Sequence, residues 1–245
     1  LKNRLLMRTA RLFLMAVALM IGATAFADEG MWMIQDINEA LEKNMRARGL
    51  KLAANEIYND EAPGTAVSDA VVSIGFYCTG SVISDQGLII TNHHCAYSNI
   101  AKLSTPEHNY LEDGFWAMTS EEEIPIEGET VFFLKKVFDV TEEVKGIMKE
   151  FRASGKPFGI RKICAIMEKR YKEATGMECI LSSMWAAEKY YMSVYKTYTD
   201  LRLVAAPPQS IGYFGGNQDN WTWPRHNCDF TIYRIYEDGK PVTRE

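Results

Sequence analysis

The chain has 245 residues, of which 47% are hydrophobic and 24% are charged, and its formal net charge is -5. This composition is that of an ordinary globular protein and excludes a disordered or fibrous one. The excess of acidic over basic residues argues against a surface that binds nucleic acid or another polyanion.

The first 27 residues have the layout of a secretory signal peptide. Basic residues come first, and the apolar run LFLMAVALMIGATAFA then ends in the small residues Ala25 and Ala27. Segments in this order are typical of export signals. A membrane-spanning helix needs about 20 apolar residues, and this run is shorter. We therefore predict a signal peptide over residues 1–27, with cleavage after Ala27 and no membrane span in the mature chain.

The mature chain is expected to begin with an amphipathic helix over residues 31–48, because apolar side chains recur there at helical spacing. Short strands follow in AVVSIG, FYCTGSVIS and GLIITNHH, which are rich in Val, Ile and aromatic residues. The run Asp85-Gln86-Gly87 predicts a hairpin turn between the last two strands. A further strand is predicted at ETVFFLKKVFDV, residues 129–140.

A helical insert is expected at about residues 141–175. Thr141 is expected to cap its first helix, and the second helix, GIRKICAIMEKRYKEATG, is expected to end at Gly176. Strands return in MECIL, KYYMSVYKTY, LRLVAAPP and DFTIYRIY, before the turn EDGK. The pattern predicts one mainly β domain with helical insertions.

The five cysteines are an odd number, so in an exported chain at least one is free or pairs outside this sequence. Cys78 and Cys95 lie in consecutive predicted strands, where a disulfide could form and contribute about 3 kcal/mol. Cys164 and Cys179 could also pair. For Cys228 we rank a buried inert residue first, a partner for a cysteine beyond residue 245 second, and a free thiol third.

Two levels of resemblance point to a function. FYCTGSVIS and LIITNHHCAY resemble the strand pair of chymotrypsin-like serine peptidases in which the histidine directly before the cysteine is the general base. With DEGMW, YLEDGFWA, LRLVAAPPQSIGYFGG and DNWTWPRHNCDF added, essentially all of residues 28–245 is similar to the bacterial dipeptidyl-peptidase 7 and 11 family. That resemblance implies an exported serine exopeptidase of a Gram-negative bacterium, in the periplasm or on the cell surface.

The resemblance also implies a fold and a set of site residues. The fold is a chymotrypsin-like double β-barrel with an inserted helical domain. His94 falls on the general base and Asp229 on the aspartate that orients it, with His93 in a supporting role. Asn220 and Trp221 match residues that line the pocket for the free N-terminus of the substrate, where an amide oxygen and an aromatic face suit an ammonium group.

The nucleophile is not found in this sequence. No serine has a Gly-x-Ser-x-Gly or Gly-Asp-Ser-Gly setting. The resemblance places the serine and the oxyanion hole in the second half of the barrel, after the helical domain. We therefore expect residues 28–245 to be the N-terminal part of the peptidase domain, carrying the N-terminal barrel and part of the rest, and inactive alone.

Other functions stay open at this stage. The enzyme could be a chymotrypsin-like endopeptidase, or the chain could be an exported peptide-binding protein without catalysis. A zinc site could be assembled from the residues His93, His94, Cys95, His226 and Cys228. Because the HHC run lacks the usual ligand spacing and export favours disulfides, we expect no metal and no cofactor. The expected partners are peptides with free N-termini, with a homodimer as a further expectation.

Overall fold

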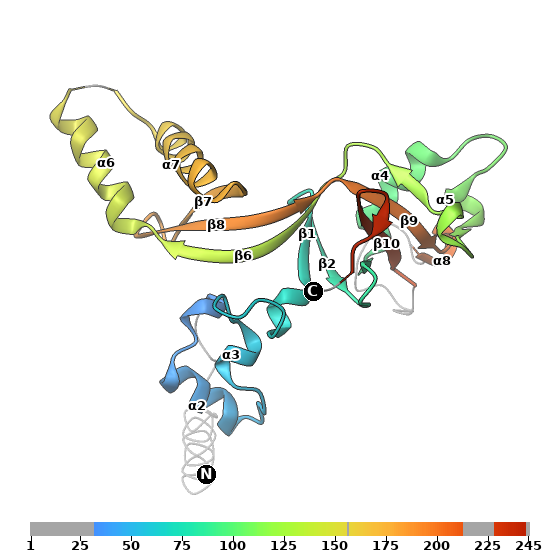
Figure 1. Cartoon of the computed structure of the whole chain (residues 1–245), viewed down its shortest axis with the longest axis horizontal. Helices are drawn as coiled ribbons and strands as arrows, with labels where there is room; N and C mark the ends of the chain where they lie inside the picture. Colours follow the sequence, from blue (N-terminus) through green and yellow to red (C-terminus); the bar gives the residue numbers. More distant parts are fainter. Residues whose placement is uncertain (1–31, 156, 213–227, 244–245) are drawn as a thin grey trace, which may run out of the picture. The chain divides into compact units, whose positions relative to one another are not determined.

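The computed structural model describes residues 32–155, 157–212 and 228–243 (Figure 1). The chain divides into two compact units, Leu1–Asp36 and Ile37–Glu245. The predicted signal peptide lies outside the described residues. The β-sheet, the two hydrophobic cores that pack against it and the candidate site all belong to the second unit.

The helices within the described residues are short except for α4, α6 and α7. They are η1 (Ile34–Asp36), α2 (Glu39–Ala47), α3 (Ala54–Ile57), η2 (Val67–Ala70), α4 (His93–Leu103), α5 (Tyr110–Asp113), η3 (Ser120–Glu122), α6 (Thr141–Ala153), α7 (Ile160–Thr175) and α8 (Gln209–Gly212). None of them is both long and apolar enough to cross a membrane.

The predicted helix over residues 31–48 is interrupted, so that prediction was wrong in its extent. A single turn, η1, ends at Asp36, and a separate helix, α2, begins at Glu39. The cause is Asn38, whose side-chain Oδ1 accepts a hydrogen bond from the Leu41 backbone N–H at 3.0 Å. An asparagine that accepts this bond starts a new helix, because it satisfies one of the free N–H groups of the first turn.

The strands form one antiparallel sheet in the described part of the chain. They are β1 (Val71–Ile74), β2 (Cys78–Val82), β3 (Leu88–Thr91), β4 (Phe115–Trp116), β5 (Ile124–Ile126), β6 (Val131–Asp139), β7 (Glu178–Met184), β8 (Lys189–Tyr198), β9 (Asp200–Ala206), β10 (Thr231–Glu237) and β11 (Lys240–Pro241). Their order is β4-β9-β10-β3-β2-β1-β6-β8-β7, with β5 paired to β9 and β11 to β10. The predicted mainly β fold is confirmed.

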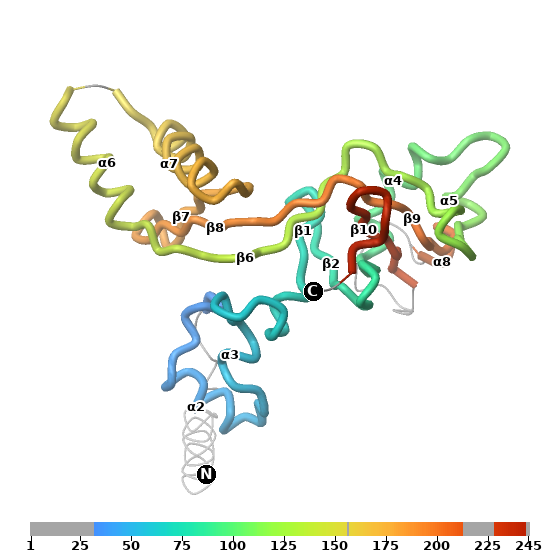
Figure 2. Tube along the Cα trace, viewed as in Figure 1, coloured from blue at the N-terminus to red at the C-terminus, as the bar shows by residue number. Residues whose placement is uncertain are grey.

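One pairing joins segments that are far apart in the sequence. Strand β10 lies antiparallel to β3, with Thr231 opposite Thr91 and Arg234 opposite Leu88. Figure 2 shows this late strand beside the early β2–β3 hairpin. The register places Asp229, two residues before β10, next to the residues that follow β3.

A first core is formed by strands from both halves of the sheet. Its fully buried members include Ile74 of β1, Ile89 of β3, Leu203 of β9 and Tyr233 of β10, and α4 adds Ile100. Because strands near the two ends of the sheet path share this core, the sheet wraps around it as a barrel wall does.

A second core lies between the helical hairpin α6–α7 and the strands β6, β7 and β8. Val144 and Met167 from the helices pack against Met192 and Val194 from β8. Figure 1 shows both helices on the same side of the β7–β8 ribbon. The long strands β6 and β8 therefore take part in both cores.

The start of α6 differs from the prediction, while the end of α7 matches it. Asp139, and not Thr141, supplies the acceptor at the helix start, because its Oδ1 accepts the Thr141 backbone N–H at 3.0 Å. The Thr141 hydroxyl instead accepts the Tyr190 N–H of β8, also at 3.0 Å. Gly176 ends α7 in the left-handed conformation, at φ 68°.

Candidate active site

The run TNHHC lies at the junction of a strand and a helix. Strand β3 ends at Thr91, whose hydroxyl donates to the Thr79 carbonyl of β2 at 2.9 Å. Helix α4 then begins at His93, with Asn92 in the extended conformation before it. The prediction that the strand continues through both histidines was wrong, because they form the first turn of α4.

The disulfide between Cys78 and Cys95 is present as predicted, but it joins different elements. Cys78 begins β2 and Cys95 lies in the first turn of α4, with their Cα atoms 6.0 Å apart. The bond therefore fastens the start of the helix to the sheet, beside His94.

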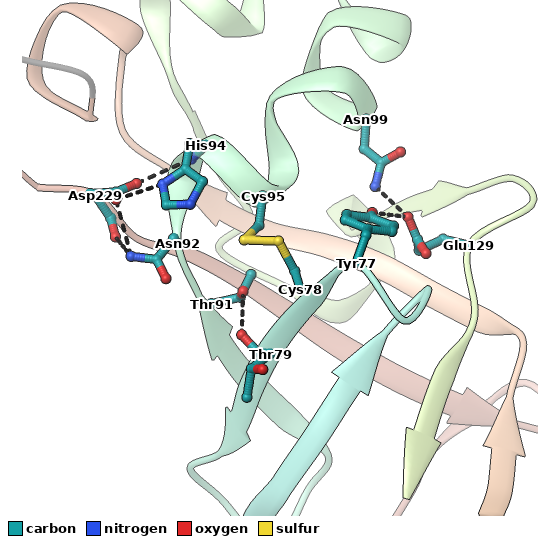
Figure 3. Close-up of a disulfide and its surroundings, with 10 residues drawn as sticks. All are labelled: Tyr77, Cys78, Thr79, Thr91, Asn92, His94, Cys95, Asn99, Glu129 and Asp229. Carbon is teal, nitrogen blue, oxygen red and sulfur yellow. Dashed lines mark hydrogen bonds and ion pairs between the residues drawn. A yellow bond between two sulfur atoms is a disulfide. The ribbon is translucent and has the colours of Figure 1, made fainter. Parts of the chain in front are cut away.

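His94 and Asp229 form a close pair (Figure 3). The ring Nδ1 of His94 lies 2.8 Å from Asp229 Oδ2, and the His94 backbone N–H donates to Oδ1 at 3.1 Å. A carboxylate can only accept, so Nδ1 carries the proton. The lone pair then belongs to Nε2, on the far side of the ring. The His94 side chain is 57% exposed, so this nitrogen can meet a substrate or another side chain.

Asn92 makes a third set of contacts with the same aspartate. Its side-chain Nδ2 donates to Asp229 Oδ2 at 3.0 Å and to the Asp229 backbone carbonyl at 3.2 Å. Burial acts to raise the pKa of the Asp229 carboxyl, but the hydrogen bonds from His94 and Asn92 more than offset burial. The pKa of Asp229 therefore lies below its ordinary value, and the group is an anion at neutral pH.

The two adjacent histidines have opposite surroundings. His93 is fully buried, and burial lowers its pKa, so its ring is neutral at pH 7. Helix α8 closes over it. A Cβ atom on Gly212 would lie only 2.7 Å from the His93 ring, so the absence of a side chain permits this contact. His93 fills space beneath the site, whereas His94 faces outward.

A match to a known protein family decides the family of this chain. Residues 27–244 match the family described as Peptidase S46. The chain belongs to the peptidase S46 family. The resemblance predicted from the sequence motifs is thereby confirmed.

Named relatives of this S46 chain are dipeptidyl peptidases. It is 41% identical over 245 residues to dipeptidyl-peptidase 7 of Phocaeicola vulgatus. That match covers 96% of this chain and 34% of the relative. It is 43% identical over 234 residues to the Asp/Glu-specific dipeptidyl-peptidase of Porphyromonas gingivalis, covering 92% of this chain and 32% of the relative.

A solved structure supports the same relationship. The crystal structure of Porphyromonas endodontalis DPP11 in complex with the dipeptide Arg-Glu matches with a TM-score of 0.77 and 39% identity, over 89% of this chain and 32% of that one. This match agrees with a chymotrypsin-like β-barrel fold. The S46 chain spans about a third of the length of the relatives that it matches.

A second polar cluster lies on the other side of the disulfide in the S46 chain. The buried carboxylate of Glu129 accepts hydrogen bonds from the Asn99 side chain at 2.9 Å and from the Tyr77 hydroxyl (Figure 3). Asn99 belongs to α4, and Tyr77 lies in the turn between β1 and β2. The cluster thus ties the middle of α4 to the sheet, while the disulfide ties its start.

The sequence motifs indicate neither Asn92 nor Glu129 as a site residue. The strand predicted through both histidines places Asn92 within a strand, where it has no role at a helix start. Glu129 stands in an acidic, Gly-containing run, IEGET, that is typical of an exposed turn. The available signal is its position at the start of the strand predicted over residues 129–140, two residues before the observed strand β6.

The remaining cysteines differ from the expectations. Cys164 and Cys179 are not bonded to each other: Cys164 is half-buried in α7 and Cys179 is buried in β7. Cys228 is a free, exposed thiol, so its interpretation as a buried residue was wrong. Its backbone N–H donates to the Ile211 carbonyl at 3.1 Å.

Two members of the zinc alternative are not available as ligands. His93 is buried, and Cys95 is in a disulfide. Within the described ranges, no group of three or more His, Cys, Asp or Glu side chains could hold a metal ion. The predicted pocket residues Asn220 and Trp221, like His226, lie outside the described residues.

Proposed function

We propose that this chain forms the N-terminal part of a serine dipeptidyl peptidase in which His94 is the general base and Asp229 orients it. The observation that carries the proposal is the double contact between the two residues, through the ring at 2.8 Å and through the His94 backbone N–H at 3.1 Å. Two contacts to one carboxylate fix both the position and the tautomer of the imidazole.

In the proposed reaction, the nucleophilic serine comes from sequence beyond this chain. Its hydroxyl oxygen attacks the peptide carbonyl carbon while the hydroxyl proton moves to Nε2 of His94. Asp229, an anion at neutral pH, stabilises the imidazolium that forms. The same proton then passes to the leaving amine nitrogen as the peptide bond breaks. Water repeats the sequence on the acyl-serine and releases the dipeptide.

The proposed substrates are peptides with a free N-terminus. The dipeptidyl-peptidase relatives support this class. Asn220 and Trp221 are the residues that we assign to the pocket for the terminal ammonium. Leaving an amide oxygen without its charged partner inside a pocket costs about 1–3 kcal/mol, which corresponds to about 5- to 160-fold discrimination.

Export of the mature protein is part of the proposal. The signal-like segment supports cleavage after Ala27 and a location in the periplasm or on the cell surface. Sequencing the N-terminus of exported protein should find Asp28 first, and an unprocessed N-terminus would contradict the assignment. We also propose a homodimer, which light scattering of the purified protein can test.

The activity is tested in a protein extended to the length of the relatives. We expect dipeptides to be released from free N-termini and not from N-acetylated peptides. His94→Ala should abolish turnover, and Asp229→Asn should lower it by about 10⁴-fold, because an amide favours the wrong tautomer of the imidazole. His93→Ala is the matched control and should retain more activity than His94→Ala.

Other outcomes would identify the alternatives. Cleavage inside long acetylated chains at comparable rates would show an endopeptidase. Peptide binding without any cleavage would show a binding protein. Equal loss of activity at both histidines, or activity that follows bound metal, would contradict the assignment of His94 as the general base.

A further inference from the structure

Helix α4 begins after an asparagine that does not cap it. Asn92 occupies the N-cap position, and asparagine is among the residues that most favour it. Its side chain nevertheless makes no capping hydrogen bond. Asn38, in the same position before α2, makes the usual one, accepting the Leu41 N–H at 3.0 Å. Two asparagines at equivalent positions are thus used differently.

The capping acceptor of α4 comes from a distant residue. The His94 N–H belongs to the second helical position, the position that an N-cap side chain commonly satisfies. Here Asp229 Oδ1 accepts that N–H at 3.1 Å. The carboxylate therefore caps the helix across the β3–β10 pairing, and its negative charge lies at the positive end of the helix dipole.

Asn92 is consequently free to act as a donor. Its Nδ2 reaches Oδ2 of Asp229 at 3.0 Å and the Asp229 backbone carbonyl at 3.2 Å. Oδ2 is the same oxygen that faces the His94 ring at 2.8 Å. Figure 3 shows Asn92 in contact with Asp229. A donor that holds both the carboxylate and the main chain of one residue restrains the rotation of that carboxylate.

We propose that Asn92 is a positioning residue for the His94–Asp229 pair, not a helix cap. The inference rests on the proposed function for its catalytic consequence, but the geometry stands without it. Asn92 keeps Oδ2 directed at the His94 ring and keeps the carboxylate ionised. Without that donor, Asp229 rotates more freely and takes up a proton at higher pH.

The decisive variants are Asn92→Asp and Asn92→Ala, with Asn38→Ala as the matched control. Aspartate caps helices as well as asparagine does, so a capping role predicts that Asn92→Asp resembles the wild type. Positioning predicts the opposite, because aspartate at neutral pH donates nothing and repels Asp229. In the extended enzyme we expect kcat/KM to fall about tenfold in Asn92→Ala, and further, by about 100-fold, in Asn92→Asp.

The separate effects on kcat and KM distinguish positioning from a loss of substrate binding. A poorly oriented base slows the chemical step, so Asn92→Ala should lower kcat and leave KM close to that of the wild type. Asn38→Ala should leave both constants unchanged. Wild-type rates in Asn92→Asp, or a loss in Asn92→Ala that lies entirely in KM, would overturn the proposal.

A second measurement does not depend on catalysis. The ¹³C signal of the Asp229 carboxyl can be titrated in the extended protein, whether or not that protein is active. Asn92→Ala should shift the Asp229 titration to higher pH, and Asn38→Ala should not. An unshifted titration in Asn92→Ala would refute the role of Asn92 even in an active enzyme. A shifted titration in an extended protein without peptidase activity would leave the Asn92 contact intact and refute only the proposed function.

Discussion

Loss of the Cys78–Cys95 disulfide is expected to lower the free energy of unfolding by about 3 kcal/mol. The two cysteines are separated by 17 residues along the chain. For a loop of this size, the chain-entropy relation gives about 3 kcal/mol at 25 °C, because the bond restricts the unfolded chain. Both side chains are only partly buried, so replacing them leaves little empty space in the core.

The perturbation is the double variant Cys78→Ala/Cys95→Ala, and the assay is urea unfolding of the oxidised protein. Its unfolding midpoint should fall to that of the wild-type protein with reductant. Reductant should then have no further effect on the double variant. Cys164→Ala, which removes a free and half-buried thiol, is the matched control and should keep the full response to reductant.

Two results would refute this reasoning. A double variant within about 1 kcal/mol of the wild type would mean that the loop is already restricted in the unfolded chain. A double variant that still responds to reductant as strongly as the wild type would mean that another cysteine pair carries the effect.

Two further predictions concern buried and exposed carboxylates. Glu129→Ala should lower the free energy of unfolding by about 2–4 kcal/mol, because it leaves the buried Asn99 donor without its acceptor. Glu129→Gln should lower that free energy by less. Glu127→Ala, at an exposed site, should leave it almost unchanged in the same denaturation assay. The pKa of Asp139 lies at about 2, below its ordinary 3.8, mainly because Lys189 donates a hydrogen bond to it. A depressed pKa stabilises the fold above pH 3.8, and this contribution is lost as the pH falls through about 2. The stability difference between the wild type and Asp139→Asn should therefore shrink over that range, and a difference at pH 2 as large as at neutral pH would contradict the assignment.

Much of the fold could be predicted from the sequence because it depends on neighbours along the chain. The β-branched runs, the Asp85-Gln86-Gly87 turn and the glycine after α7 are local signals, and the structure has strands, a hairpin and a helix end at these places. The residues at which strands and helices begin and end were less predictable. Strand β3 ends at Thr91, whereas the predicted strand continues through both histidines. The chain instead enters a helix whose first turn is stabilised by a distant carboxylate.

The candidate site, like the fold, is only partly predictable from the sequence. Motifs and family resemblance alone predict His94, Asp229 and the Cys78–Cys95 bond. They did not show that His93 is buried under Gly212, nor that Glu129 holds the middle of α4. Those facts depend on which surfaces meet in the folded chain.

By itself, the sequence determined the secondary-structure types, the family and the residue types available for chemistry. The tertiary structure decided how those residues are used, as Asn92 illustrates. An asparagine before a helix can cap it or donate elsewhere, and the two choices are close in energy. The pairing of β10 with β3 settles the choice, because it places Asp229 where its carboxylate accepts the helix N–H and also receives the Asn92 amide. No pattern of neighbouring residues contains that information, since the register joins segments about 140 residues apart.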